Sequence, residues 1–131
     1  MPVRLLLDTH AFLWWLDGDR RLEPAVRRLI ADEDNAIFVS AAAAWEIATK
    51  FRLGKLDGAA AVAADIGGAL ASQGFLALHI TIRHAQMAGG LAGPLRDPFD
   101  RMLIAQCHAE GLPLVSIDTA FDTYGVRRVW D

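Results

Sequence analysis

Short apolar runs alternate with longer segments of helical pattern along the chain, and this alternation is what most constrains its fold. The run VRLLL at residues 3–7 is apolar enough for a strand buried on both faces. Similar runs follow at residues 36–40, 75–80, 112–118 and 126–130. Strands that alternate with helices predict an α/β fold: a central parallel sheet of four or five strands with helices on both faces.

Capping signals set the expected ends of the helices. Ser40 is a good N-cap, and Asp97 followed by Pro98 marks another helix start that runs to Gly111. We expect helical segments over residues 10–16, 25–33, 41–54, 59–72, 81–89, 98–110 and, as a short turn, 119–125. We find no repeat or linker, and therefore expect one domain over residues 1–131.

Composition narrows the class of protein. Apolar residues make up 53% of the chain and charged residues 22%, which is typical of a globular domain. Asp8 and His10 interrupt the first apolar run, unlike a secretory signal, and residues 59–80 are too polar for a membrane span. We therefore expect a cytoplasmic protein with no membrane partner. Cys107 is the only cysteine, which excludes an intramolecular disulfide and a cysteine-cluster metal site.

The net charge of −3 argues against a basic protein that coats nucleic acid through many phosphate contacts. It leaves open a nucleic-acid enzyme whose carboxylates are neutralised by bound metal, since the charge of the ion reverses the local electrostatics. The positions of the acidic residues therefore matter more than their total.

Four of the sixteen acidic residues lie where a parallel α/β fold would gather them. Asp8 ends the first predicted strand and Asp118 ends the fourth, while Asp100 lies in the first turn of a helix. Glu46 lies among apolar residues in the predicted helix AAAAWEIATKFRLG. The carboxyl ends of parallel strands share one edge of the sheet, so these side chains should face one small volume.

Simpler explanations exist for each acidic residue. Asp8 and Asp118 could be helix N-caps, and Asp97 with Asp100 could form a capping pair. Glu46 could pair with Lys50 one helical turn later. If the four carboxylates do converge, protons or cations must neutralise them. Oxygen ligands without His or Cys suit Mg²⁺ or Mn²⁺.

Four stretches together resemble a PIN-domain ribonuclease, and within that family a VapC-type toxin of bacterial toxin–antitoxin pairs. They are LLLDTHAFLWWL, VSAAAAWEIATKFRLGKL, RDPFDRMLIAQCHAEGLPLVSID and AFDTYGVRRVW, and they span nearly the whole chain. The resemblance implies a divalent-metal site formed by Asp8, Glu46, Asp100 and Asp118, with Asp97 as a cap and Asp122 outside the site. Related sequences often have His before Arg-Asp-Pro-Phe-Asp, where this chain has Leu95.

The resemblance further implies hydrolysis of RNA phosphodiester bonds with one or two Mg²⁺ or Mn²⁺ ions. Asp8 and Asp100 would hold the metal most directly, while Glu46 and Asp118 would complete the shell or position the water. Candidate RNA contacts lie on or beside these segments: His10, Lys50, Arg52, Arg96 and Arg101.

Toxins of this kind are bound by a VapB-type antitoxin, and they form homodimers or larger toxin–antitoxin assemblies. The aromatic and aliphatic residues Phe12, Trp14, Trp15 and Leu16 could fill the core. Alternatively, part of this surface, with the helix AVRRLI, could receive a partner.

We considered three other functions; the sequence disfavours the first two and leaves the third open. A phosphotransfer receiver domain needs a lysine after a late strand, whereas the only lysines are Lys50 and Lys55. A phosphatase of the haloacid dehalogenase type needs a second Asp two residues after the first, where this chain has His10. A catalytically inactive PIN fold that only binds RNA or protein is the alternative that remains.

Overall fold

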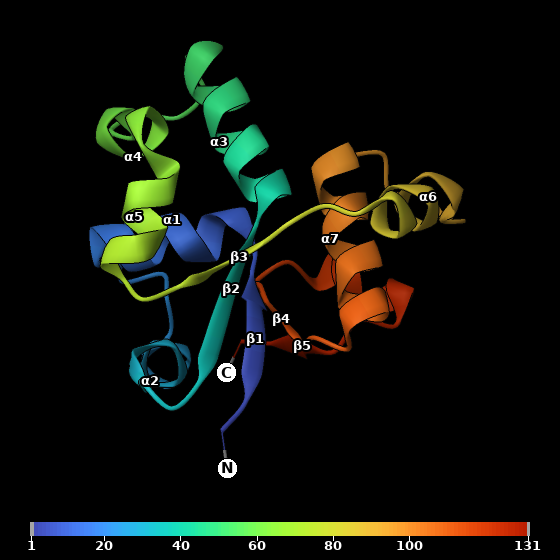
Figure 1. Ribbon diagram of the computed structural model, residues 1–131, viewed down its shortest axis with the longest axis horizontal. Coiled ribbons are helices and arrows are strands. Elements are labelled where there is room, and N and C mark those ends of the chain that lie inside the picture. Colours follow the sequence, from blue (N-terminus) through green and yellow to red (C-terminus); the bar gives the residue numbers. More distant parts are fainter. Residues whose placement is uncertain (1, 131) are drawn as a thin grey trace.

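The computed structural model describes residues 2–130 and contains a five-stranded sheet in the order β3-β2-β1-β4-β5 (Figure 1). Every pair of neighbouring strands is parallel. The strands are β1 (Arg4–Leu7), β2 (Ala36–Ser40), β3 (Leu76–Leu78), β4 (Leu114–Val115) and β5 (Arg128–Val129). The parallel α/β fold predicted from the alternating pattern is therefore confirmed.

Helices cover both faces of this sheet. They are α1 (Thr9–Asp17), α2 (Pro24–Ala31), α3 (Ala41–Arg52), α4 (Ala60–Ala64), α5 (Ile66–Ser72), α6 (Ile82–Gly90) and α7 (Pro98–Glu110), followed by the 3₁₀ helix η1 (Thr119–Tyr124). Helices α1, α2, α4 and α5 lie on one side and α6 and α7 on the other, while α3 extends beyond the carboxyl ends of the strands (Figure 1). No helix within residues 2–130 has the length and apolar character needed to cross a lipid bilayer.

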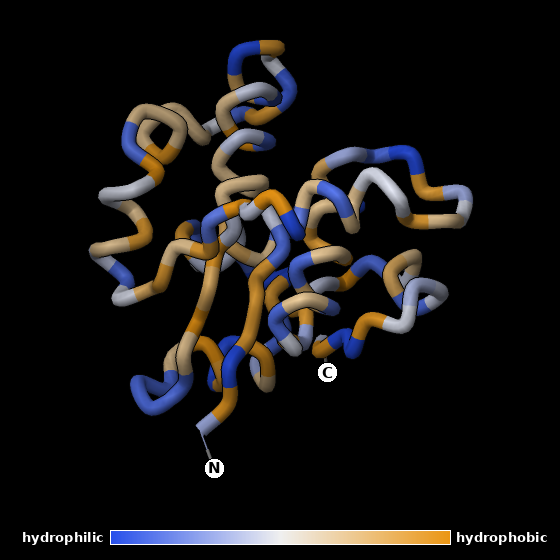
Figure 2. The backbone as a smooth tube through the Cα atoms, turned by 45° about the vertical axis from the view of Figure 1, so that its right-hand side comes forward, coloured by the Kyte–Doolittle hydropathy of each residue, from blue (hydrophilic) through white to orange (hydrophobic). Residues whose placement is uncertain are grey.

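The central strand β1 joins two hydrophobic cores, one on each face of the sheet. Leu5 and Leu7 pack in the core with Phe12 of α1, whereas Leu6 packs with Ile104 of α7 in the other core. The two longest strands, β1 and β2, consist mostly of hydrophobic residues (Figure 2). Leu6 is fully buried, and burial of such a side chain stabilises the fold by about 1.5–3 kcal/mol. These contacts fix β1, and with it the position of Asp8.

Several predicted elements differ from the structure, and the strands expected over residues 75–80 and 126–130 are shortened to β3 and β5. The single helix expected over residues 59–72 is two helices, because Asp65 ends α4 and its carboxylate caps α5 by accepting the Gly68 N–H at 2.9 Å. The strand expected over residues 112–118 is only two residues long. Beyond it, the Ser116 hydroxyl accepts the Asp118 N–H at 3.0 Å and turns the backbone toward η1.

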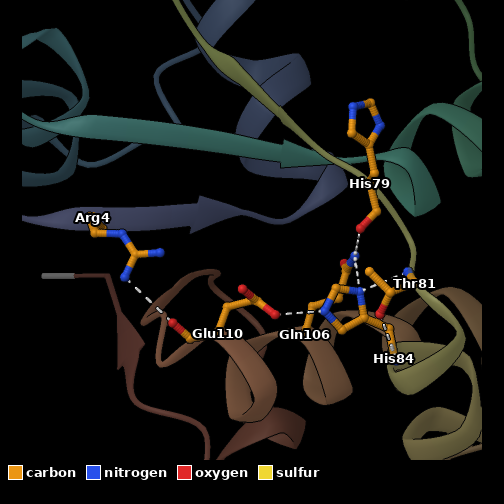
Figure 3. A network of polar contacts seen from close by, with 6 residues as sticks. All are labelled: Arg4, His79, Thr81, His84, Gln106 and Glu110. Atoms are coloured by element: carbon orange, nitrogen blue, oxygen red, sulfur yellow. Dashed lines mark hydrogen bonds and ion pairs between the residues drawn. The ribbon is translucent and has the colours of Figure 1, made fainter.

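A polar network fixes α6 against α7 (Figure 3). The buried His84 ring lies 2.9 Å from Glu110 through Nε2, and its Nδ1 accepts the Thr81 N–H at 3.1 Å. Gln106 Nε2 donates to the His79 carbonyl oxygen at 3.4 Å. The network thus joins the start of α6 to the last turns of α7.

Candidate functional site

The candidate site lies at the carboxyl edge of the sheet, beside the neighbouring strands β1 and β4, where the order of the strands reverses. Strand β1 pairs with β2 on one side and with β4 on the other. Successive strands run outward from β1 toward β3 before the chain returns to β4, so this is the topological switch point. Asp8 directly follows β1, and its N–H donates to the Val115 carbonyl oxygen at 3.1 Å.

Asp8 is both a helix cap and a member of the site. Its Oδ1 accepts the Ala11 N–H at 2.8 Å, which confirms the predicted N-cap of α1. Burial raises the pKa of the Asp8 carboxyl, against opposing hydrogen bonds from Ser116 and Ala11. The cap uses Oδ1, and the same carboxylate also lines the pocket described next.

A pocket of about 100 Å³ gathers the predicted acidic residues. We call it the acidic pocket; its lining is Asp8, Thr9, His10, Glu46, Lys50, Asp97, Asp100, Ile117, Asp118 and Phe121. The acidic side chains among them come from beyond the ends of β1 and β4, from α3 and from the start of α7, while α1 and η1 supply the remaining wall. The structure thus brings all four predicted acidic residues to one place.

Asp100 lies partly buried among the other acidic residues. Its pKa is raised to about 7, first by burial and then by the charges of Asp97, Glu46, Asp118 and Asp8. Asp97 is the N-cap of α7, because its Oδ1 accepts the Phe99 N–H at 2.8 Å and the Asp100 N–H at 3.3 Å. No reciprocal bond from the Asp100 carboxylate back to Asp97 occurs within residues 2–130, so Asp100 is not used for capping.

Glu46 is buried and both of its carboxylate oxygens are engaged. Oε1 accepts the Thr9 hydroxyl at 2.6 Å, and Oε2 accepts from the Lys50 ammonium. Burial acts to lower the pKa of Lys50, but its hydrogen bond to Glu46 and the surrounding carboxylate charges leave that pKa raised. The predicted pairing of Glu46 with Lys50 is therefore confirmed, and it coexists with a place in the acidic pocket.

The chemistry of the acidic pocket fits a hard divalent cation. Its candidate ligands are carboxylate oxygens, and five acidic residues line it against the single ammonium of Lys50. As the side chains stand, no three Asp, Glu, His or Cys groups in the described part of the chain are placed to bind one ion together. Binding of an ion would therefore require side-chain movement in this pocket, including release of Glu46 by Lys50.

The predicted RNA-contacting residues occupy different surroundings. His10 lines the acidic pocket and lies beside Trp14, with a ring-centroid distance of 5.7 Å. Arg52 and Arg96 are exposed. Arg101 instead donates to the backbone carbonyls of Leu91, Leu95 and Ala88, so it holds the connection between α6 and α7.

Sequence reasoning missed two hydroxyl residues of the site. Thr9 bonds to Glu46, and the Ser116 side chain bonds to Asp8 and accepts the Asp118 N–H. The signal was present in the sequence, since each hydroxyl lies within two positions of a predicted acidic residue, in LLLDTH and LVSID.

The exposed apolar residues are not those that the sequence suggested as a partner surface. Phe12 is fully buried, while Trp14, Trp15 and Leu16 pack against the core on the α1 side. Trp45 of α3 is instead 61% exposed and stacks edge-to-face on Phe99 at a centroid distance of 4.9 Å. These two aromatic rings border an apolar cavity of about 280 Å³ that contains no carboxylate.

Comparisons with known proteins agree with this architecture. The crystal structure of VapBC2 from Rickettsia felis bound to a DNA fragment from their promoter superposes with a TM-score of 0.71 at 15% identity. The match covers 98% of this chain and 99% of that one, and at this identity it shows the fold. No curated protein sequence matches. The family model of the PIN domain matches residues 5–126, nearly the whole chain. The chain therefore belongs to the PIN-domain family.

Proposed function

We propose that this protein is a metal-dependent endoribonuclease that acts as the VapC-type toxin of a toxin–antitoxin pair in the cytoplasm. PIN domains are generally nucleases, and PIN nucleases generally depend on divalent metal. The structural likeness to a VapBC2 complex supports the toxin assignment. A PIN fold that binds without cleaving is the competing proposal.

The convergence of Asp8, Glu46, Asp100 and Asp118 on the acidic pocket carries this proposal. A purely structural role does not explain it, because grouped like charges destabilise a fold unless something neutralises them. The capping bonds of Asp8 and Asp118, and the bond from Ser116 to Asp8, explain the positions of these carboxylates but supply no positive charge. A site that only bound protein would not need this concentration of charge.

In the proposed reaction, Asp8, Glu46, Asp100 and Asp118 would hold Mg²⁺ or Mn²⁺. The ion, when bound, lowers the pKa of a water molecule and stabilises charge on the phosphate and the leaving oxygen. Asp8 and Asp118 place their carboxylates beyond the ends of β1 and β4, and Asp100 supplies a carboxylate that takes no part in the cap of α7. His10, Arg52 and Arg96 are the proposed RNA contacts. We leave out Arg101, whose guanidinium donates to backbone carbonyls, and Lys50, whose ammonium is bound to Glu46.

We also propose a VapB-type antitoxin and a second copy of the chain as partners. The neighbouring structure is itself a VapBC2 complex. Large exposed apolar side chains such as Trp45 and Ile82, which is 86% exposed, are typical of surfaces that bind protein. Light scattering of the purified protein at increasing concentration would test self-association, and a strictly monomeric chain would contradict it.

RNA-end sequencing after brief expression in bacterial cells tests the function most informatively. We expect new RNA ends and growth arrest with the wild-type chain, and neither with Asp8→Asn, whose polar side chain keeps the α1 cap. Undiminished cleavage by Asp8→Asn would contradict the metal mechanism. Specific RNA binding without new ends would favour the inactive PIN fold.

A further inference from the structure

Glu46 and Lys50 form an ion pair in the wall of the acidic pocket that engages the carboxylate a metal would need. Lys50 holds Oε2 of Glu46 and the Thr9 hydroxyl holds Oε1 at 2.6 Å. The Lys50 ammonium and a divalent ion on the same carboxylate would lie within a few ångströms and repel each other. A metal that takes Glu46 as a ligand must therefore separate it from Lys50.

Lys50 is placed to act as a removable cation. Among the described residues that line the acidic pocket, it is the only lysine or arginine. Its side chain is 32% exposed, whereas that of Glu46 is 6% exposed. The long flexible stem of Lys50 can carry its charge into water, while the buried Glu46 stays in place.

Thr9 would keep the Glu46 carboxylate oriented if the Lys50 ammonium moved away from it. It lies in the first turn of α1, next to the cap formed by Asp8, and is 5% exposed. Its bond to Oε1 orients the Glu46 carboxylate independently of the ammonium. Departure of Lys50 would thus expose Oε2 of an already oriented carboxylate toward the acidic pocket.

We propose that Lys50 is the resident cation of the acidic pocket: it neutralises Glu46 in the metal-free protein and competes with divalent metal for that carboxylate. Lys50 is then a positioning residue that acts through Glu46 and sets the metal concentration at which the site fills. This inference rests on the proposed function, because it requires a divalent ion to bind in the acidic pocket.

Substitution of Lys50 by Met tests the competition directly. We expect Lys50→Met to melt at a lower temperature than wild type in EDTA, because Glu46 loses its counter-charge. At the same time the Kd for Mn²⁺, measured by calorimetry on the purified full chain, should fall about tenfold, as expected when one charge-assisted hydrogen bond no longer has to be broken. A merely structural role for Lys50 would lower the melting temperature without tightening Mn²⁺ binding.

Two further variants sharpen the comparison. Lys55→Met, at the only other lysine, is the matched control, because Lys55 is exposed and lies outside the acidic pocket; it should leave the Kd unchanged. In a Glu46→Gln background, Lys50→Met should no longer tighten Mn²⁺ binding, since the competed carboxylate is absent. Lys50→Gln, which keeps a polar contact without the charge, carries the same expectation should Lys50→Met fail to fold.

The outcomes separate this inference from the proposed function. An equal or higher Kd in Lys50→Met and Lys50→Gln, with wild type binding Mn²⁺, overturns the role of Lys50 alone. Tightened binding that persists in the Glu46→Gln background also overturns it. Absence of Mn²⁺ binding in wild type and in every variant overturns the metal site and this inference together.

Discussion

Replacement of Asp100 by Asn removes one charge from the acidic pocket with little change of shape. The Asp100 carboxylate is not used in the capping of α7, which Asp97 provides. The substitution therefore changes mainly the electrostatics of the cluster. We expect Asp100→Asn to stabilise the metal-free protein and to weaken its response to metal, two effects of opposite sign.

The size and pH dependence of the first effect follow from the raised pKa of Asp100. Its value in the fold is about 7, against 3.8 for the free side chain, so the folded state holds this proton more tightly. The free energy of unfolding contributed by this group therefore falls as pH rises from about 4 to about 7. Because Asp100 is partly exposed, screening by water reduces the penalty to roughly 1–2 kcal/mol at pH 8.

Thermal unfolding in EDTA measures this penalty. At pH 8, Asp100→Asn should melt about 3–8 °C above wild type, and the difference should shrink as the pH approaches 4. Excess Mn²⁺ should raise the melting temperature of wild type by mass action and that of the variant by less. Equal melting temperatures in EDTA at pH 8, or an equal Mn²⁺ response, would refute the reasoning.

Three stability predictions concern the scaffold. Leu6→Ala should lower the free energy of unfolding by about 2–5 kcal/mol in a urea titration, because Leu6 is fully buried; a loss below 1 kcal/mol would contradict its central place. His84→Ala should lower the melting temperature by breaking the contact with Glu110 and the cap of α6, and an unchanged value would show that this network does not stabilise the fold. Gly93→Ala should also lower the melting temperature, because φ is +108° and an added Cβ would lie 2.5 Å from the Tyr124 hydroxyl; an unchanged value would place this segment differently.

The frame of the fold was predictable because its signals are local. The apolar run before Asp8 marks β1, and Asp8 itself, Ser40 and Asp97 all cap helices as predicted. The convergence of the four acidic residues followed from topology, since the carboxyl ends of parallel strands meet at one edge. This convergence could be predicted without knowing which side chains touch each other.

Features that depend on contacts between distant segments were not predictable in the same way. Thr9 and Glu46 are 37 positions apart, and only packing of α1 beside α3 brings them together. Arg101 resembled an RNA contact because it follows Asp100, yet its neighbours in space are backbone carbonyls of the α6–α7 connection. The break at Asp65 depended on a choice between continuing one helix and capping the next.

Cleavage of single-stranded RNA by the purified protein tests the central claim most directly. The measurement compares Mn²⁺ with EDTA for wild type, for Asp8→Asn, and for Asp57→Asn as a control at an exposed acidic residue outside the acidic pocket. We expect RNA to be cut only with Mn²⁺ or Mg²⁺, at similar rates by wild type and Asp57→Asn, and not by Asp8→Asn. Cleavage that continues in EDTA, or at the wild-type rate in Asp8→Asn, would contradict a metal-dependent site at the carboxyl edge of the sheet.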